Sequence, residues 1–299
     1  CFIMNFEKIF LSLLMLHIIQ PSFCQSNILI NIWGNKEKPF YKENTLEEYF
    51  KKEWGTLNVY NVTEPTLEIF PAKGKNQNKC VLILPGGGYS LVAINHEGYD
   101  IARILSEHGI TSAVLKYRLP NILSSNQPHK VPLIDTRKAL KILRTRTKEF
   151  KYGTDQIGII GFSAGSHLAA MASLLDSGNN VERPNFVALI YGVTRLKNKT
   201  QIHLEENLFY RKLTIEEEFQ LDLINLINEN TPPTFLVHAY DDSVCHVSES
   251  TDYAGKLFEK NIPVEMHLFA KGGHGFGLGR EIDGTDQWLN LFISWLSKL

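Results

Sequence analysis

Residues 157–166 read Ile157-Gly158-Ile159-Ile160-Gly161-Phe162-Ser163-Ala164-Gly165-Ser166. The apolar start of this stretch predicts a buried strand, and residues 166–175 predict a helix. A sharp turn from strand to helix crowds the backbone, so it needs small side chains, which the flanking glycines and Ala164 supply. We interpret residues 161–165 as a nucleophile elbow, a turn that holds the Ser163 hydroxyl out from the edge of a sheet.

Strands and helices are predicted to alternate on both sides of this turn. The predicted strands are the apolar runs at residues 80–84, 111–117, 157–160, 186–191, 234–238 and 264–269. The predicted helices are the amphipathic stretches at residues 97–107, 133–150, 248–260 and 286–299. Alternation of this kind is typical of a mainly parallel sheet with helices on both faces. Short runs at residues 28–33, 58–62 and 66–70 predict an antiparallel lead-in of edge strands.

Residues 195–231 lie between two of the predicted strands. This segment is polar and charged at first and then carries apolar residues at mostly helical spacings. An insertion after a central strand predicts a small helical cap over the mouth of a pocket.

Length, charge and cysteine content limit the class of protein. The chain has 299 residues, of which 43% are hydrophobic, so it can bury one large core. Its 31 basic and 32 acidic residues give a net charge of -1, which gives no reason to expect a nucleic-acid partner. Beyond the N-terminal segment only Cys80 and Cys245 remain, which is neither a disulfide framework nor a zinc-site spacing. The sequence leaves open whether these two cysteines pair.

The N-terminal segment has the pattern of a secretory signal. Lys8 precedes an apolar run at residues 9–19 that is too short to span a bilayer. Ser22 and Cys24 are small residues that suit cleavage before Gln25. We therefore expect residues 1–24 to comprise a signal peptide and upstream residues. The mature protein is then expected to be secreted or periplasmic, without membrane contact after cleavage.

A serine nucleophile needs a base and an acid. Its hydroxyl is weakly nucleophilic at neutral pH, so a histidine must take the proton and a third group must orient that histidine. His274 follows the last predicted strand and has glycines on both sides, which let its loop fold back towards the elbow. The acid should follow the strand at residues 234–238, where Asp241 and Asp242 are adjacent. We choose Asp242, with Asp241 as the alternative.

The negative oxygen that forms during acyl transfer needs N–H donors. Ala164, the residue after the nucleophile, supplies one backbone N–H. Gly87 and Gly88 end another predicted strand, and consecutive glycines can aim their amides at one point. The chain order Ser163, Asp242, His274 is that of the α/β-hydrolases. We therefore expect a single α/β-hydrolase domain over residues 25–299.

From about Trp33 to the C-terminus the sequence resembles the secreted α/β-hydrolase esterases grouped with acetyl xylan and feruloyl esterases. The motifs that carry the resemblance are Val62-Thr63-Glu64-Pro65-Thr66-Leu67, Pro85-Gly86-Gly87-Gly88-Tyr89, His96-Glu97-Gly98, Leu115-Lys116-Tyr117-Arg118-Leu119-Pro120, Gly161-Phe162-Ser163-Ala164-Gly165-Ser166-His167-Leu168-Ala169, His238-Ala239-Tyr240-Asp241-Asp242 and Gly272-Gly273-His274-Gly275-Phe276-Gly277. In that family the matching serine, second aspartate and glycine-flanked histidine form the triad, which favours Asp242 over Asp241. The sequence departs from the family at His246, where a proline is common.

The resemblance implies an activity. It points to a secreted serine carboxylesterase that hydrolyses acetyl or feruloyl esters on plant cell-wall polysaccharides through an acyl-enzyme, with no metal or organic cofactor. The substrate would be an acylated carbohydrate or a small ester. The resemblance also brings Tyr89, His96 and Glu97 beside the oxyanion loop, where they would line the acyl or sugar pocket or cap the helix that starts near Glu97.

Two other functions share the fold. A serine peptidase of the prolyl-oligopeptidase type uses the same triad order, but Ser166 stands where that class often has a further glycine after the elbow. A secreted binding module could have inherited the fold without the activity. The sequence leaves open the acyl group, the sugar and the oligomeric state.

Overall fold

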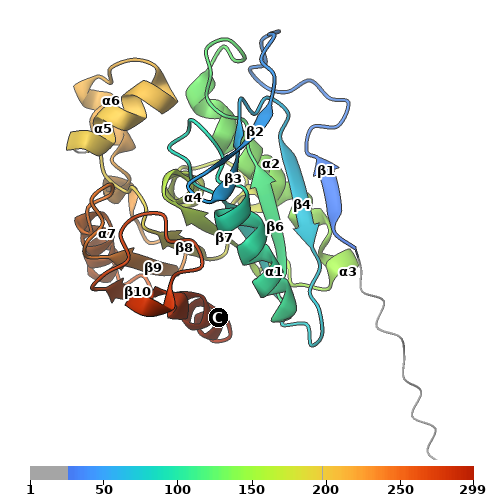
Figure 1. The fold of residues 1–299 in the computed structure, drawn as a ribbon, viewed down its shortest axis with the longest axis vertical. Helices are drawn as coiled ribbons and strands as arrows, with labels where there is room; N and C mark the ends of the chain where they lie inside the picture. Colours follow the sequence, from blue (N-terminus) through green and yellow to red (C-terminus); the bar gives the residue numbers. More distant parts are fainter. Residues whose placement is uncertain (1–25, 197) are drawn as a thin grey trace, which may run out of the picture.

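A computed structural model describes residues 26–196 and 198–299 of the chain (Figure 1). An eight-stranded sheet forms its centre, in the spatial order β1-β4-β6-β5-β7-β8-β9-β10. These strands are β1 (Ile28–Asn31), β4 (Thr66–Phe70), β5 (Cys80–Leu84), β6 (Thr111–Lys116), β7 (Ile157–Phe162), β8 (Val187–Ile190), β9 (Thr234–Ala239) and β10 (Val264–Phe269). The predicted signal segment, residues 1–24, lies outside the described residues.

The sheet is mainly parallel. All neighbours from β6 to β10 in the sheet order run parallel, whereas β1 and β4 form an antiparallel edge beside β6. The central strands β5, β7, β8 and β9 are buried along their whole length because other elements cover both faces. The predicted α/β architecture is therefore confirmed.

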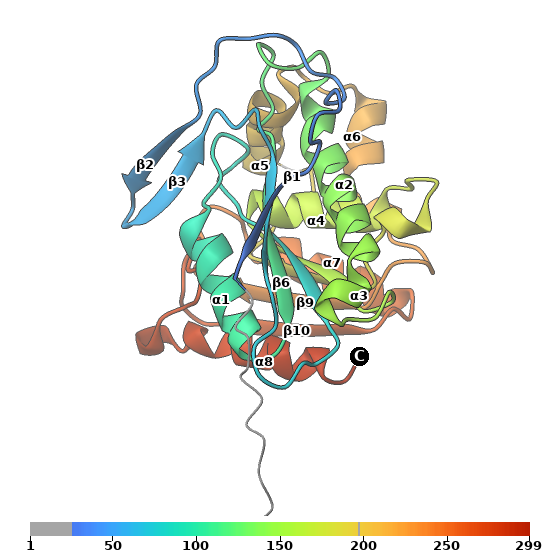
Figure 2. The same cartoon turned by 90° about the vertical axis from the view of Figure 1, so that its right-hand side faces the viewer.

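Helices cover the two faces of the sheet. The α-helices in the described ranges are α1 (Asp100–Glu107), α2 (Val131–Thr145), α3 (Thr147–Phe150), α4 (Ala164–Leu174), α5 (Asn198–Leu204), α6 (Ile215–Leu221), α7 (Ser248–Glu259) and α8 (Trp288–Leu296), of which α5 and α6 do not lie on a face of the sheet (Figure 1). Figure 2 shows α1 on one face and α2 and α4 on the other. Every residue of α4 is buried, and apart from His167 the side chains of this helix are small or apolar.

The strand predicted at residues 58–62 is present, but its expected place among the edge strands that lead into the sheet is wrong. β3 (Thr56–Tyr60) pairs instead with β2 (Tyr49–Glu53) in a separate antiparallel hairpin. The sequence hides β2 because it lies in a charged stretch and almost all of its side chains are exposed. Cross-strand stacking of Tyr49 on Tyr60, with ring centroids 5.0 Å apart, helps to hold the pair. The hairpin projects from the body of the molecule (Figure 2).

Two predicted helices have different boundaries in the structure. The helix predicted at residues 97–107 starts with a π-helical turn, Asn95–Tyr99, and continues as α1. The helix predicted at residues 133–150 starts earlier and is divided at Arg146 into α2 and α3.

The segment between β8 and β9 contains α5 and α6, which lie together beside the sheet (Figure 1). Thr214 begins α6 with a capping box, in which its hydroxyl accepts from the Glu217 N–H and the Glu217 carboxylate accepts from the Thr214 N–H. None of the helices in the described ranges is long and apolar enough to cross a membrane.

Cys80 and Cys245 are both buried free thiols. Burial raises the pKa of the Cys80 thiol to about 12 and raises that of Cys245 as well. Both side chains therefore stay protonated and act as small apolar core residues.

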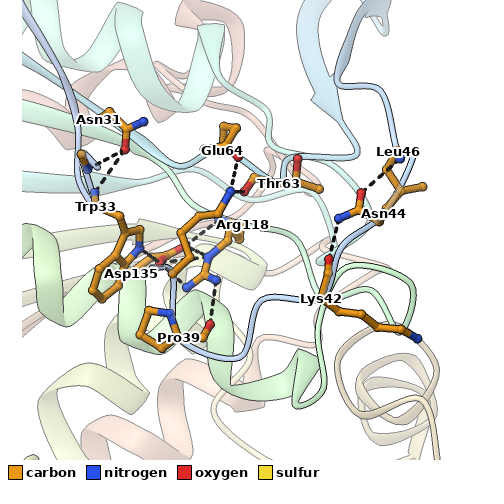
Figure 3. A network of polar contacts seen from close by, with 12 residues as sticks. Asn31, Trp33, Pro39, Lys42, Asn44, Leu46, Thr63, Glu64, Arg118 and Asp135 are labelled. Carbon is orange, nitrogen blue, oxygen red and sulfur yellow. Dashed lines mark hydrogen bonds and ion pairs between the residues drawn. The ribbon is translucent and has the colours of Figure 1, made fainter. Parts of the chain in front are cut away.

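A buried ion pair joins α2 to the end of β6 (Figure 3). The Arg118 guanidinium donates to the Asp135 carboxylate from Nη2 over 2.7 Å and from Nε over 2.9 Å. The same carboxylate accepts from Trp33 Nε1 over 2.8 Å, and Arg118 Nη1 donates to the Pro39 carbonyl over 2.9 Å. The pair therefore ties the N-terminal segment to the sheet.

We predict that Arg118→Ala lowers the free energy of unfolding by about 3–5 kcal/mol, because it leaves the Asp135 carboxylate buried without a counter-charge. Urea unfolding followed by circular dichroism measures the change. Arg103→Ala is the matched control, since its pair with Asp100 is partly exposed and should contribute less than about 1 kcal/mol. Equal losses in the two variants would contradict the assigned role of the buried pair.

Candidate active site

The turn after β7 has the geometry of an elbow. Ser163 has φ 51° and ψ -119°, a conformation that non-glycine residues rarely adopt. A Cβ atom on Gly161 would lie 2.2 Å from the Gly165 carbonyl oxygen, and one on Gly165 would lie 2.0 Å from the Leu84 carbonyl oxygen. Only glycine fits at these two positions, which is the steric reason for the pattern around Ser163.

Three side chains from distant loops form a hydrogen-bonded series. The Ser163 Oγ lies 2.8 Å from Nε2 of His274, and Nδ1 of His274 lies 2.8 Å from Oδ2 of Asp242. Because the Asp242 carboxylate accepts from the Nδ1–H group, Nε2 carries the lone pair and accepts from the Ser163 hydroxyl. Asp242 follows β9 and His274 follows β10, so both lie at the carboxyl edge of the sheet where the elbow also ends.

Asp242 is held as a carboxylate. Its Oδ1 accepts from the backbone N–H groups of Val244 and Cys245, each over 2.9 Å, and Nε2 of His238 lies 3.2 Å from its Oδ2. Burial alone would raise the pKa of this carboxyl. The hydrogen bonds from His238, His274 and Cys245 outweigh burial and hold the pKa well below its usual range.

The adjacent carboxylate has a different place. Asp241 is exposed and accepts from the Gly273 N–H over 2.7 Å. Asp241 therefore contacts the backbone of the histidine loop, whereas Asp242 contacts the imidazole itself. Of the two carboxylates that the sequence leaves as alternatives, the structure brings Asp242 to His274.

The glycine loop after β5 presents backbone amides beside the serine. Gly87 and Gly88 have φ angles of 120° and 62°, which favour glycine. Within the described ranges, no hydrogen bond uses the N–H of Gly87, Gly88 or Ala164. These residues line a cavity of about 920 Å³ together with Ser163 and His274. The cavity therefore contains amide donors next to the serine hydroxyl.

The three predicted substrate-binding residues have different surroundings. Tyr89 is 1% exposed, hydrogen bonds through its hydroxyl to His167 Nδ1 over 2.8 Å and does not line the cavity. The expectation for Tyr89 is therefore corrected: its left-handed backbone, φ 61°, directs the ring under the elbow. His96 does line the cavity, and its Nδ1 lies 3.1 Å from the Thr56 hydroxyl.

Glu97 joins the glycine loop to the histidine loop. Its Oε2 accepts from the Gly86 N–H over 2.7 Å, and its Oε1 accepts from the Tyr191 hydroxyl over 2.8 Å. The Tyr191 oxygen in turn accepts from the Gly277 N–H over 3.1 Å. Glu97 reaches the cavity wall but is buried, so it neither caps a helix with its side chain nor stands free for a ligand.

The sequence interpretation missed several residues at the site. Tyr191 packs its ring 5.1 Å from the His274 ring, with an unusual φ of 39° directly after β8. Trp54 and Asn58 of the hairpin and His203 of α5 also line the cavity. Tyr191 could have been found because it ends a central parallel strand, where site residues collect. The hairpin residues had no such signal.

Among the described residues, no three His, Cys, Asp or Glu side chains cluster as metal ligands.

The sheet order, the elbow after β7 and the placement of Asp242 and His274 after β9 and β10 define an α/β hydrolase. Residues 67–257, more than half of the chain, match the family model BD-FAE. The chain therefore belongs to the BD-FAE family, and the resemblance to α/β-hydrolase esterases is confirmed.

Curated relatives cover the chain well but are longer. Endo-1,4-beta-xylanase B of Butyrivibrio fibrisolvens is 33% identical over 211 residues, which are 68% of this chain and 33% of that protein. Acetylxylan esterase of Xylanibacter ruminicola is 28% identical over 249 residues, which are 82% of this chain and 50% of that protein. The chain thus spans half or less of the length of these relatives.

A solved structure matches over nearly the whole of both chains. The crystal structure of the acetyl ester-xyloside bifunctional hydrolase from Caldicellulosiruptor lactoaceticus is 29% identical, with a TM-score of 0.76. The match covers 91% of this chain and 96% of that one.

We predict that His167 makes stability depend on pH. Burial lowers the pKa of its imidazole from 6.5 to about 4. Between these values the unfolded chain binds more protons than the folded one, so stability falls as the pH falls from about 6.5 towards 4. By this linkage the wild type should lose about 2 kcal/mol between pH 7.5 and pH 5.

The comparison is with His167→Gln, which has no titrating group but keeps a hydrogen-bonding partner for Tyr89. Urea unfolding at the two pH values should show the wild type losing about 2 kcal/mol more than this variant. Equal losses would contradict a neutral, buried His167.

Proposed function

We propose that this chain is a serine carboxylesterase of the acetyl xylan esterase type. The observation that carries the proposal is the hydrogen-bonded series from Ser163 through His274 to Asp242. This series opens on a cavity with backbone amides that no hydrogen bond between described residues uses. This is the arrangement that acyl transfer requires: a nucleophile, a base held in the correct tautomer and donors for a negative oxygen.

In the proposed reaction, the Ser163 oxygen attacks the ester carbonyl carbon and its proton moves to Nε2 of His274. Asp242 stabilises the imidazolium that forms, without itself taking the proton. The carbonyl oxygen becomes negative and is bound by the N–H groups of Gly87, Gly88 and Ala164. Each such donor typically contributes about 3 kcal/mol to the transition state.

The intermediate collapses when the alcohol leaves with the proton from His274, and the acyl group remains on Ser163. Water then attacks the acyl-enzyme, with its proton passing to His274. Release of the carboxylic acid returns the proton to the Ser163 oxygen. The cycle consumes one ester and one water and needs no group beyond the side chains and amides of this chain.

The proposed substrate is an acylated plant cell-wall polysaccharide. The resemblance to acetyl xylan and feruloyl esterases supports an acetyl or feruloyl ester, and the names of the acetylxylan esterase and the acetyl ester-xyloside hydrolase favour acetyl on xylan. The cavity of about 920 Å³ is far larger than an acetyl group, which supports an alcohol part of considerable size.

We further propose that residues 195–231 act as a cap on this domain and that the mature protein, residues 25–299, is exported. For the cap, Thr200, His203 and Leu204 line the cavity, and His203 Nε2 donates to the Gly88 carbonyl over 3.0 Å. For export, the support is the short apolar run at residues 9–19 and the small residues before Gln25.

Ser163→Ala is predicted to fold normally and to lose at least about 10⁴-fold in kcat on p-nitrophenyl acetate, because no other group can hold the acyl intermediate. Release of p-nitrophenol measures turnover, and circular dichroism checks the fold. Ser177→Ala, in the loop after α4, is the control and should match the wild type. Faster hydrolysis of a dipeptide p-nitroanilide than of the ester would favour a peptidase instead.

The two adjacent aspartates provide a second test. Asp242→Asn should lower kcat by about 10³–10⁴-fold, because an amide at this position no longer favours the reactive tautomer of His274. Asp241→Asn should lose less than about tenfold, since Asp241 accepts from the Gly273 N–H and does not contact the imidazole of His274. Initial rates on p-nitrophenyl acetate measure both. The reverse ranking would show that the wrong carboxylate has been assigned as the acid.

A further inference from the structure

Trp54 stands at the tip of the β2–β3 hairpin and lines the cavity that contains Ser163. Its side chain is 81% exposed, and its backbone has a φ of 50°, which is costly for a bulky residue. A turn of this kind normally carries Asn, Asp or Gly at this position. An exposed tryptophan in a strained turn at the mouth of a cavity indicates a ligand contact.

The hairpin is fixed to the body of the domain. Val59 of β3 exchanges two backbone hydrogen bonds with Val92, over 2.9 and 2.8 Å, and Thr56 contacts His96 over 3.1 Å through its hydroxyl. Within the hairpin itself, Glu53 at the end of β2 accepts a hydrogen bond from the Tyr60 hydroxyl of β3, which links the two strands. These contacts hold the hairpin beside the cavity, so a ligand would not have to order it.

Asn58 supplies a second, independent observation. Its side chain is 1% exposed and lines the same cavity. Within the described ranges neither Oδ1 nor Nδ2 of this amide has a hydrogen-bond partner. Buried amides are normally paired because desolvation without a partner is unfavourable. The unpaired donor and acceptor therefore point to a polar ligand that satisfies both.

Trp54 and Asn58 offer complementary chemistry to one ligand. The face of an indole ring is electron-rich and attracts groups with partial positive charge. One face of a pyranose ring presents C–H groups of this kind, while its rim carries hydroxyls that both donate and accept hydrogen bonds. An amide with a free Oδ1 and a free Nδ2 can pair with two such hydroxyls.

We propose that Trp54 and Asn58 form a sugar subsite, in which a pyranose ring of the ester's alcohol part stacks on Trp54 and its hydroxyls bond to the Asn58 amide. This inference rests on the proposed function and deepens it, because it assigns the part of the cavity beside the hairpin to the carbohydrate. A feruloyl group could also stack on Trp54, but its ring carries a single hydroxyl, whereas a pyranose ring presents several hydroxyls that both donate and accept, so we assign the sugar.

The first experiment compares two esters. We expect Trp54→Ala to lower the ratio of kcat/KM on acetylated xylotetraose to kcat/KM on p-nitrophenyl acetate by about tenfold, through KM. Phe50→Ala is the matched control, because Phe50 is an exposed aromatic on the same hairpin that does not line the cavity. It should leave the ratio unchanged. A ratio within about twofold of the wild type in Trp54→Ala would overturn the proposal.

Methyl ferulate separates the two occupants of the Trp54 face. If Trp54 holds the sugar, Trp54→Ala should change the kcat/KM for methyl ferulate no more than that for p-nitrophenyl acetate. A selective loss of about tenfold on methyl ferulate would overturn the proposal in favour of the acyl group.

The second experiment measures binding without hydrolysis. Titration calorimetry with unacetylated xylotetraose on the Ser163→Ala protein should give a Kd that Trp54→Ala and Asn58→Leu each weaken by about tenfold. Asn58→Leu should also unfold at the same or a higher temperature, since it replaces an unpaired buried amide by an apolar side chain of similar size. A merely structural Asn58 would give the opposite pattern, with lower stability and unchanged binding.

These two experiments separate the subsite from the reaction. If the esterase proposal is wrong, the wild type will hydrolyse no ester. The calorimetry would still report whether the hairpin binds a sugar. If the wild type turns over p-nitrophenyl acetate but does not bind xylotetraose, and Trp54→Ala behaves like the wild type, the subsite proposal alone is overturned.

Discussion

The hydrogen bond between the Ser163 hydroxyl and His274 Nε2 is the contact on which the site depends. It joins two loops that are 111 residues apart in the chain, and it can form only because β7 and β10 run parallel and end at the same edge of the sheet. On the serine side of this bond, glycine at positions 161 and 165 allows the tight turn that presents the Ser163 hydroxyl, because a Cβ at either position would clash with the backbone. On the other side, the Asp242 carboxylate is kept ionised by its own hydrogen bonds and orients the imidazole.

A second, buried set of contacts links the loops from behind. Glu97 binds the Gly86 N–H and the Tyr191 hydroxyl, and Tyr191 binds the Gly277 N–H in the loop of His274. The amide donors and the base are thus positioned by one connected group of hydrogen bonds. Since each loop would otherwise be free to move separately, this group favours a site that is formed before any ligand arrives.

Sequence reasoning predicted the parts of the molecule that local chemistry decides. The buried strands read as continuous apolar runs, and the glycine pattern around Ser163 follows from contacts within a few residues. The hairpin was missed because β2 is charged and exposed, so that its pairing with β3 depends on a partner that the periodicity does not reveal. Tyr89 was misassigned because its direction is set by a left-handed backbone and by the distant His167.

The roles of Glu97 and Asn58 could not have been predicted for a related reason. Each depends on which residues from other elements surround it in the folded chain. The motif His96-Glu97-Gly98 indicates that the position matters, but only the structure connects Glu97 to Tyr191. Similarly, the alternating pattern in β3 predicts on which face of the strand Asn58 lies. It does not predict that a cavity borders this face.

The central claim is that Ser163 is an activated nucleophile, and labelling by a fluorophosphonate probe tests it most directly. Peptide mass spectrometry of the labelled wild-type protein should find one adduct per chain, located on Ser163, with little labelling after denaturation. A folded protein that stays unlabelled, or that carries the adduct on another residue, would contradict the account.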